Sequence, residues 1–137
     1  MIIDKFLQVS NEQTVTATAA STDQIDFGQT RPNSGINHML SMVITVDQGV
    51  TAAGAATVTF AVQDSADGTT FADVAVTAAI GKADLGLGKQ VVIPMPVKHR
   101  RYVRVNYTVG TGPLTAGKFS AQVVAGYQEN QPYPGVL

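Results

Sequence analysis

The sequence predicts an all-β domain, an antiparallel β-sandwich of the jelly-roll type with about eight strands. Three observations lead to this expectation. Val, Thr, Ala and Gly dominate the 137 residues, a composition that favours strands and turns over helices. Apolar side chains recur at every second position, and no window sustains the 3.6-residue period of a helix. Turn-forming Gly, Pro, Asn and Asp separate the alternating segments at short intervals.

The chain is expected to open with an arm followed by two short strands. Residues 1–12 are apolar and have no obvious strand partner, so we interpret them as an N-terminal arm that lies on a neighbouring subunit. A segment packed on its own core is the alternative. Residues 13–20 alternate weakly and carry small side chains. Residues 24–28 place Ile25 and Phe27 on one face, which is typical of a short strand. A loop containing Pro and Gly follows.

Four strands are predicted in the middle of the chain. Residues 38–47 and 56–64 alternate clearly between apolar and polar side chains. An Asp-Gly pair then predicts a tight reversal into residues 71–78. Residues 90–95 form a short strand, and its prolines, which lack an amide hydrogen, place it at a sheet edge. The expected inward-facing side chains of the two clearest strands are Leu40, Met42, Ile44, Val46, Val58, Phe60 and Val62.

The last two strands lie in residues 101–127, on either side of the loop sequence GTGPLTAG. This loop is long for a hairpin and is expected to reach outward. Residues 128–137 contain two prolines and a glycine and are expected to form an extended tail, leaving residues 13–127 as the sandwich domain. An immunoglobulin-like sandwich is the alternative arrangement. The expected core residues of the two strands are Val103, Val105, Tyr107, Phe119 and Val123.

No pattern in the sequence indicates catalysis. The absence of cysteine excludes disulfides, a cysteine zinc site and a cysteine nucleophile. The two histidines form no metal-binding motif, and the acids of residues 64–68 fit a turn better than a calcium loop. No apolar run approaches the roughly 20 residues of a membrane span, and the N-terminus lacks the features of a signal peptide. We therefore expect no enzyme, no cofactor and no membrane partner.

Charge is segregated along the chain although the net charge is only −1. Residues 1–84 have three basic and nine acidic side chains, whereas residues 85–128 have six basic and none acidic. The basic run from Lys98 to Arg104 is the strongest charge feature, and it predicts charge-to-charge docking on a protein. A solvated strand end is the alternative. Direct nucleic-acid binding is not expected, because only Tyr102 interleaves with these cations.

Three segments resemble the jelly-roll capsid cement (decoration) proteins of tailed bacteriophages: MIIDK at the start, TATAAST at 16–22, and RYVRVNYTVGTGPLTAGKF at 101–119. The resemblance runs over most of the chain. It implies a protein that binds the outer surface of a shell of HK97-like major capsid protein and stabilises it across capsomer junctions. It further implies a homo-oligomer, a dimer before a trimer. Such a protein is made in the host cytoplasm and ends on the outer capsid surface of the virion.

The expected interface combines the apolar ends, the basic run and the loop. A carbohydrate-binding or adhesin-like β-sandwich module of a virion is the alternative function, and it needs exposed aromatic residues in a groove. Another virion part, such as a tail component, is a further alternative that its low copy number per particle distinguishes. The residues expected to contact the capsid or a sister subunit are Ile2, Ile3, Phe6, Leu7, Lys98, Arg100, Arg101, Tyr102, Arg104, Pro113, Leu114, Tyr133, Val136 and Leu137.

Overall fold

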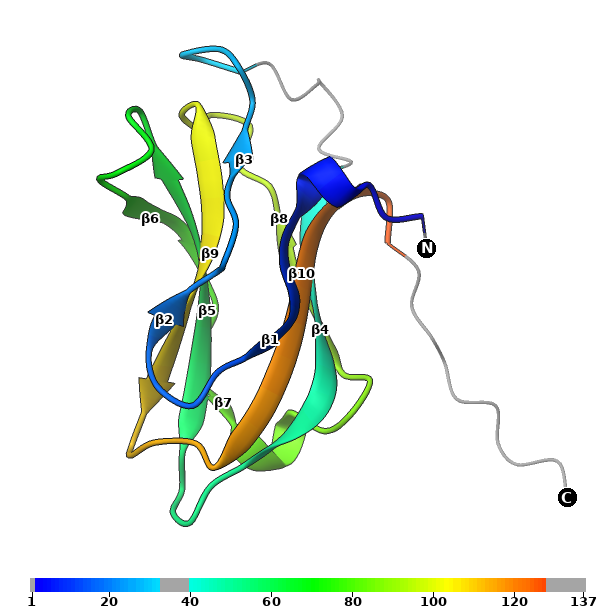
Figure 1. The fold of residues 1–137 in the computed structure, drawn as a ribbon, viewed down its shortest axis with the longest axis vertical. Helices are drawn as coiled ribbons and strands as arrows, with labels where there is room; N and C mark the ends of the chain where they lie inside the picture. Colours follow the sequence, from blue (N-terminus) through cyan, green and yellow to red (C-terminus); the bar gives the residue numbers. More distant parts are fainter. Residues whose placement is uncertain (1, 33–39, 128–137) are drawn as a thin grey trace, which may run out of the picture.

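The computed structural model describes residues 2–32 and 40–127, which form two antiparallel β-sheets packed face to face (Figure 1). One sheet has the strand order β1–β10–β4–β8, and the other has β2–β9–β5–β6, with β3 also on β9 and β7 also on β5. The predicted antiparallel sandwich is thereby confirmed. The elements are η1 (Lys5–Leu7), β1 (Gln8–Thr14), β2 (Ala19–Ala20), β3 (Ile25–Asp26), β4 (Leu40–Thr51), β5 (Thr57–Ser65), β6 (Ala72–Val76), β7 (Ile80–Gly81), η2 (Lys82–Asp84), β8 (Gln90–Pro94), β9 (Tyr102–Gly110) and β10 (Ala116–Ala125), where η marks a 3₁₀ turn.

Four of the short strands are halves of two interrupted strands. Strands β2 and β3 pair with successive parts of β9, and β6 and β7 pair with successive parts of β5. At the first gap the Ser21 hydroxyl accepts a hydrogen bond from the amide of Val105 (3.2 Å). At the second gap the Thr77 hydroxyl accepts one from the amide of Phe60 (3.1 Å). A side-chain oxygen thus replaces a strand carbonyl, and the ladder continues.

The pairing of the resulting eight strands is that of a jelly roll. The first strand pairs with the last, the second with the seventh, the third with the sixth and the fourth with the fifth. One long hairpin folded over itself gives this pattern, and it distributes the pairs over two facing sheets. The predicted jelly roll of about eight strands is confirmed.

Three aromatic side chains fill the centre of the sandwich. Tyr107 of β9 and Phe119 of β10 stack with ring centroids 5.3 Å apart, which joins the two sheets. Phe60 of β5 meets both rings edge-on, at 5.9 and 5.4 Å. None of the three is exposed to solvent. Every core residue expected from the last two strands is buried, as are all those expected from the two clear strands except Leu40, which packs partly buried against the core.

The first strand is displaced from its expected position. Strand β1 begins at Gln8, so residues 8–12 pair with β10 and do not form part of an arm. Two register shifts interrupt the pairing, and Glu12 adopts a left-handed backbone with φ of 46°. Each shift breaks the alternation of side chains between the two faces. The period of two that identifies a strand is therefore missing from residues 8–12.

The loop between β9 and β10 does not reach outward as expected. Leu114 at its centre is only 3% exposed and packs in the core, so its assignment to an interface was wrong. Its amide donates to the carbonyl of Thr16, and the neighbouring Thr115 amide donates to Thr51 (both 2.8 Å). Pro113 beside it is exposed. The loop is thus held against the domain, and it closes one end of the sandwich.

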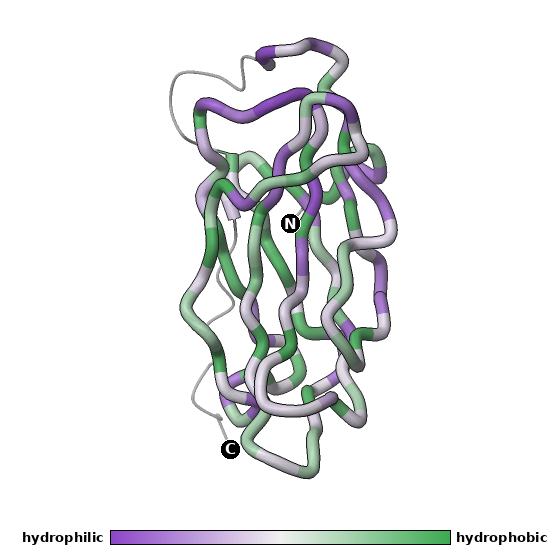
Figure 2. Tube along the Cα trace, turned by 90° about the vertical axis from the view of Figure 1, so that its left-hand side faces the viewer, coloured by the Kyte–Doolittle hydropathy of each residue, from purple (hydrophilic) through white to green (hydrophobic). Residues whose placement is uncertain are grey.

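The two ends of the sandwich differ in polarity. Hydrophilic segments gather at the end that carries the β3–β4, β5–β6 and β8–β9 connections, as the hydropathy colouring of Figure 2 shows. The opposite end, with the β4–β5 and β9–β10 connections, is built from small and weakly apolar residues. The basic run, which lies at the β8–β9 connection and the start of β9, is therefore at the hydrophilic end.

We expect Phe119→Ala to lower the free energy of unfolding by about 3–5 kcal/mol, because it removes the ring that joins the two sheets. The matched control is Phe6→Ala, which removes the same side chain from a site that is 90% exposed. The control should change the free energy of unfolding by less than about 0.5 kcal/mol. Urea denaturation measures both, and similar losses would contradict the central role of the aromatic cluster.

Candidate docking surface

The basic run that dominates the sequence lies on the β8–β9 connection and the start of β9. Met95 and His99 are buried, whereas Val97 and Lys98 are exposed. The ring of His99 lies 4.7 Å from that of Phe27, and its Nδ1 is 2.8 Å from the carbonyl oxygen of Arg100. Met95 and His99 therefore anchor the two ends of this segment, and Val97 and Lys98 between them are directed outward.

Arg100 is held by a buried carboxylate. Its Nε and Nη2 donate to Asp64 Oδ1 (2.9 and 2.7 Å), and its backbone amide donates to Oδ2 (2.8 Å). The side chain of Asp64 is 6% exposed and that of Arg100 is 42% exposed. These bonds raise the pKa of Arg100 above its ordinary value. Arg100 thus fastens the β8–β9 connection to β5, and this is a structural role.

Arg101 is paired in the same way with Asp26. Its Nε and Nη2 donate to the two carboxylate oxygens at 2.7 and 2.9 Å, and its guanidinium lies 5.0 Å from the ring centre of Tyr102. The hydrogen bonds from Arg101 and from the amide of Gly28 lower the pKa of Asp26 to about 2. Both members of this pair are about two-fifths exposed, so the attraction is screened by water.

Arg104 lies flat on an aromatic ring. Its guanidinium carbon is 3.8 Å from the ring centre of Phe71, and its Nε donates to Gln63 Oε1 (2.9 Å). The amide of Gln63 in turn donates to Asp73 (2.8 Å). Partial burial lowers the pKa of Arg104 from its ordinary value. Arg104 is therefore also held within the domain, by a cation–π contact with Phe71 and by a hydrogen bond to Gln63, which in turn binds Asp73.

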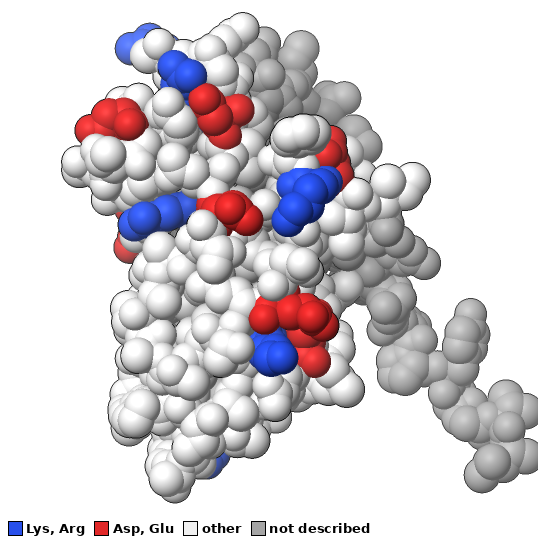
Figure 3. Space-filling model, in the orientation of Figure 1, with Lys and Arg blue, Asp and Glu red and all other residues white. Residues whose placement is uncertain are grey.

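The charge segregation of the sequence is largely cancelled in the fold. Acids from residues 1–84 pair with Arg100 and Arg101 and are linked to Arg104 through Gln63, and Figure 3 shows red and blue groups side by side on the visible face. Lys98 differs, since it makes no ion pair or hydrogen bond within the described residues. Docking through the basic run stays a prediction, and Arg100 and Arg101 already have acidic partners within the domain, which their distance in the sequence conceals.

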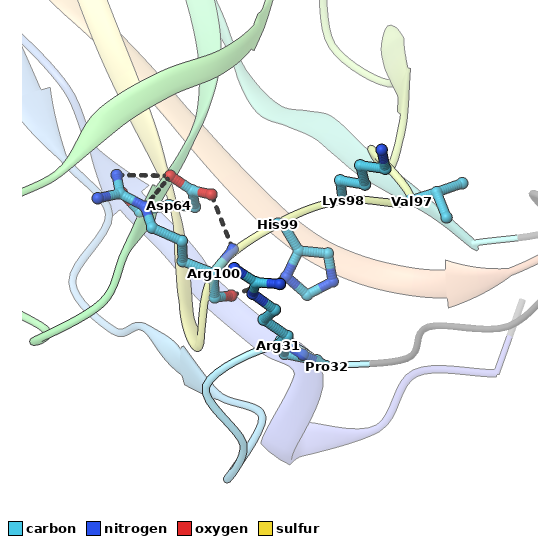
Figure 4. A pocket seen from close by; sticks show the side chains of 7 residues that line it. All are labelled: Arg31, Pro32, Asp64, Val97, Lys98, His99 and Arg100. Carbon is cyan, nitrogen blue, oxygen red and sulfur yellow. Dashed lines mark hydrogen bonds and ion pairs between the residues drawn. The ribbon is translucent and has the colours of Figure 1, made fainter.

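Lys98 and Arg31 line a hollow of about 470 Å³ at the hydrophilic end of the domain. Figure 4 shows that it lies between the β8–β9 connection and the segment after β3. Arg31 is exposed and, like Lys98, makes no ion pair within the described residues. Arg100 already occupies Asp64, the acid in the lining. The hollow therefore has an excess of positive charge and suits an acidic group.

Arg31 was missed at the sequence level. It stands 67 positions before Lys98, in the acidic half of the chain, and its neighbours predict only a loop. No spacing rule connects it with the basic run. Only the jelly-roll connections bring the two residues to the same hollow.

Of the N-terminal apolar residues, one faces the core and the others face the solvent. The carboxylate of Asp4 accepts a hydrogen bond from the amide of Phe6 (2.9 Å), which caps the short turn η1. Leu7 packs against the core, whereas Phe6 is 90% exposed and Ile2 is 96% exposed. Ile3 is 49% exposed. The expected interface residues Tyr133, Val136 and Leu137 lie outside the described residues.

The described residues present no group of three or more His, Cys, Asp or Glu side chains that could hold a metal ion. In the acidic turn at residues 64–68, hydrogen bonds from neighbouring backbone amides already engage the carboxylate of Asp67. Asp67 Oδ1 accepts hydrogen bonds from the amides of Thr69 and Thr70 (both 2.9 Å), which lowers the pKa of Asp67. Among the helical segments described, none is long and apolar enough to cross a membrane.

Comparison with known proteins adds one match. The model of the protein family described as Bbp16 matches residues 9–123, which include, in whole or in large part, the ten strands found in the described residues. No curated protein matches the chain.

We expect Asp64→Ala to lower the free energy of unfolding by about 1–3 kcal/mol, because it leaves the amide and guanidinium of Arg100 without their buried acceptor. Asp23→Ala is the matched control, since Asp23 is exposed and its side chain makes no hydrogen bond to the described part of the chain. The control should stay within about 0.5 kcal/mol of the parent chain. Equal urea midpoints for the two variants would contradict the anchoring role of Asp64.

A second expectation concerns Asp26. The pKa of Asp26 is depressed from 3.8 to about 2 in the folded chain. Its contribution to the free energy of unfolding is therefore complete above pH 4 and is lost as the pH falls toward 2. Arg101→Gln should raise the pKa of Asp26 toward its ordinary value, while Gly28 still donates. NMR titration of the carboxyl carbon measures this shift. Asp67, which is held by local bonds, is the internal control; a parallel shift there would contradict a specific effect of Arg101.

Proposed function

The chain belongs to the Bbp16 family, and we propose that it is a capsid cement protein of a tailed bacteriophage, bound to the outer surface of the major capsid protein shell. The observation that carries the proposal is the resemblance of residues 101–119 to such proteins. These residues form β9 and the start of β10, an inner strand of each sheet, so the resemblance concerns the centre of the fold. The proposed partner is a major capsid protein with an HK97-like fold.

The surface of the domain supports a binding role. The hollow with Arg31 and Lys98 offers uncompensated positive charge for acidic side chains of the shell. Phe6 and Ile2 offer apolar area, and burial of such a side chain stabilises a contact by roughly 1.5–3 kcal/mol. The paired arginines, in contrast, hold the domain in shape. A rigid domain with exposed apolar and cationic groups is suited to joining other subunits.

The proposed mechanism is physical reinforcement. Each copy contacts two or more shell subunits across a capsomer junction, so separating them exposes buried interface. Homo-oligomerisation, as a dimer before a trimer, links several such contacts, and linked contacts reinforce one another through their high effective concentration. Contacts of modest individual strength can therefore hold a shell against internal pressure.

The test mixes the purified protein with shells of the encoding phage that lack it, and follows association by co-sedimentation. We expect the parent chain to bind and Lys98→Glu to bind about five-fold or more weakly, because the new carboxylate repels an acidic partner. The matched control is Lys89→Glu, which makes the same charge change in an exposed loop outside the hollow. Urea denaturation should give equal stability for the two variants.

The outcomes separate the possible failures. If the parent chain does not associate with the shells, the cement function is wrong. If the parent chain associates and both variants weaken the association equally, the effect comes from net charge, and the hollow is not the contact site.

A further inference from the structure

A second hollow, of about 410 Å³, lies on the outer face of the β1–β10–β4–β8 sheet. Thr45, Ser120 and Gln122 are among its lining residues, and they alternate along their strands with core residues such as Phe119. Thr45 pairs directly with Ser120 across β4 and β10. Because strand side chains alternate between faces, this row points away from the core. The outer face of the sheet is therefore polar at this site.

Two carboxylates give this hollow a negative charge. Asp47 accepts a hydrogen bond from the Ser120 hydroxyl, and the same hydroxyl accepts one from the amide of Glu12 (3.0 Å). The left-handed backbone of Glu12, described above, belongs to the register shift that brings it there. Neither carboxylate forms an ion pair within residues 2–32 and 40–127.

The chain does not fill this site with a cation of its own. All nine Lys and Arg residues fall in the described ranges, and none lines the hollow. Lys118 is near in the sheet, opposite Gln48, and makes no ion pair in the part of the chain that is described. Lys5 donates to Gln8, which lines the hollow (3.4 Å), but Lys5 itself lies outside the lining. The acidic charge is therefore available to a partner.

Gln122 supplies an independent indication of a ligand. Its side chain lines the hollow, the residue is 1% exposed, and its Oε1 has no hydrogen-bond partner among the residues that the structure describes. Buried polar atoms in folded proteins are nearly always paired. Gln122 Oε1 is covered as well as unpaired, so a donor in the hollow reaches it when the Gln122 amide turns toward the hollow. A group that carries several donors and a positive charge then serves both this acceptor and the two carboxylates.

We propose that this hollow receives the guanidinium group of an arginine side chain presented by a protein partner. A guanidinium has five N–H donors and no acceptor, so it can serve Gln122 Oε1 and a carboxylate together. The aliphatic stem of the arginine packs on Ile3, which is half exposed at the rim. The hollow is also much larger than a single metal ion. This inference holds whether or not the partner is a capsid shell.

The experiment titrates the full chain with N-acetyl-arginine methylamide and follows the side-chain amide signal of Gln122 by ¹⁵N NMR. The matched ligand is N-acetyl-citrulline methylamide, which has nearly the same shape without the charge. We expect saturable shifts with the arginine compound and binding about five-fold or more weaker with the citrulline compound. Equal affinity for the two, or no saturable shift, would overturn the proposal.

Variants locate the site. Asp47→Asn and Glu12→Gln should each weaken binding of the arginine compound several-fold, whereas Asp73→Asn, on the other sheet, should leave it unchanged. Glu12 is exposed, so Glu12→Gln keeps the test decisive if Asp47→Asn fails to fold. Equal effects of all three variants would overturn the assignment. If calcium chloride or N-acetyl-lysine methylamide saturates the Gln122 signal at a lower concentration than the arginine compound does, the proposal is overturned, and calcium or lysine is the occupant of the hollow.

Discussion

The stacked rings of Tyr107 and Phe119 are the contact on which the sandwich depends. The two residues stand on strands that are consecutive in the chain but belong to different sheets, so their stacking sets how the sheets face each other. The Tyr107 hydroxyl donates to Ser10 of β1 (2.8 Å), and Ser10 donates to Gln13 (2.8 Å). Burial raises the pKa of Tyr107, which keeps this phenol a donor. One side chain thereby joins the core to the edge strand.

The sequence was informative where strands are regular. The alternation in β4, β5, β9 and β10 predicted their inner faces correctly, because an extended strand directs every second side chain to the same face. It failed at β1, where two register shifts remove that period. The docking surface was harder to predict. Asp64 and Arg100 are 36 positions apart, and only the pairing of β5 with β9 brings the Ser65 end of one strand beside the start of the other. A charge run read along the chain carries no information about such partners.

Stability and recognition are divided between different charges. Arg100 and Arg101 are paired with acids that hold connections in place, whereas Arg31 and Lys98 make no ion pair within the described residues. On the outer face of the β1–β10–β4–β8 sheet the charge is negative, with Glu12 and Asp47 lining a hollow beside Gln122, whose buried Oε1 has no partner in the described part of the chain. The domain therefore presents two hollows of opposite charge on different parts of its surface.

The edges of the β1–β10–β4–β8 sheet have a consequence for crowded copies. At one edge the register shifts around Glu12 disrupt the regular row of backbone donors and acceptors. At the other edge β8 has only five residues and ends at Pro94, which has no amide hydrogen. Irregular or shortened edges resist the addition of a strand from a neighbouring molecule. Both edges of this sheet therefore offer a neighbouring molecule little regular backbone to pair with.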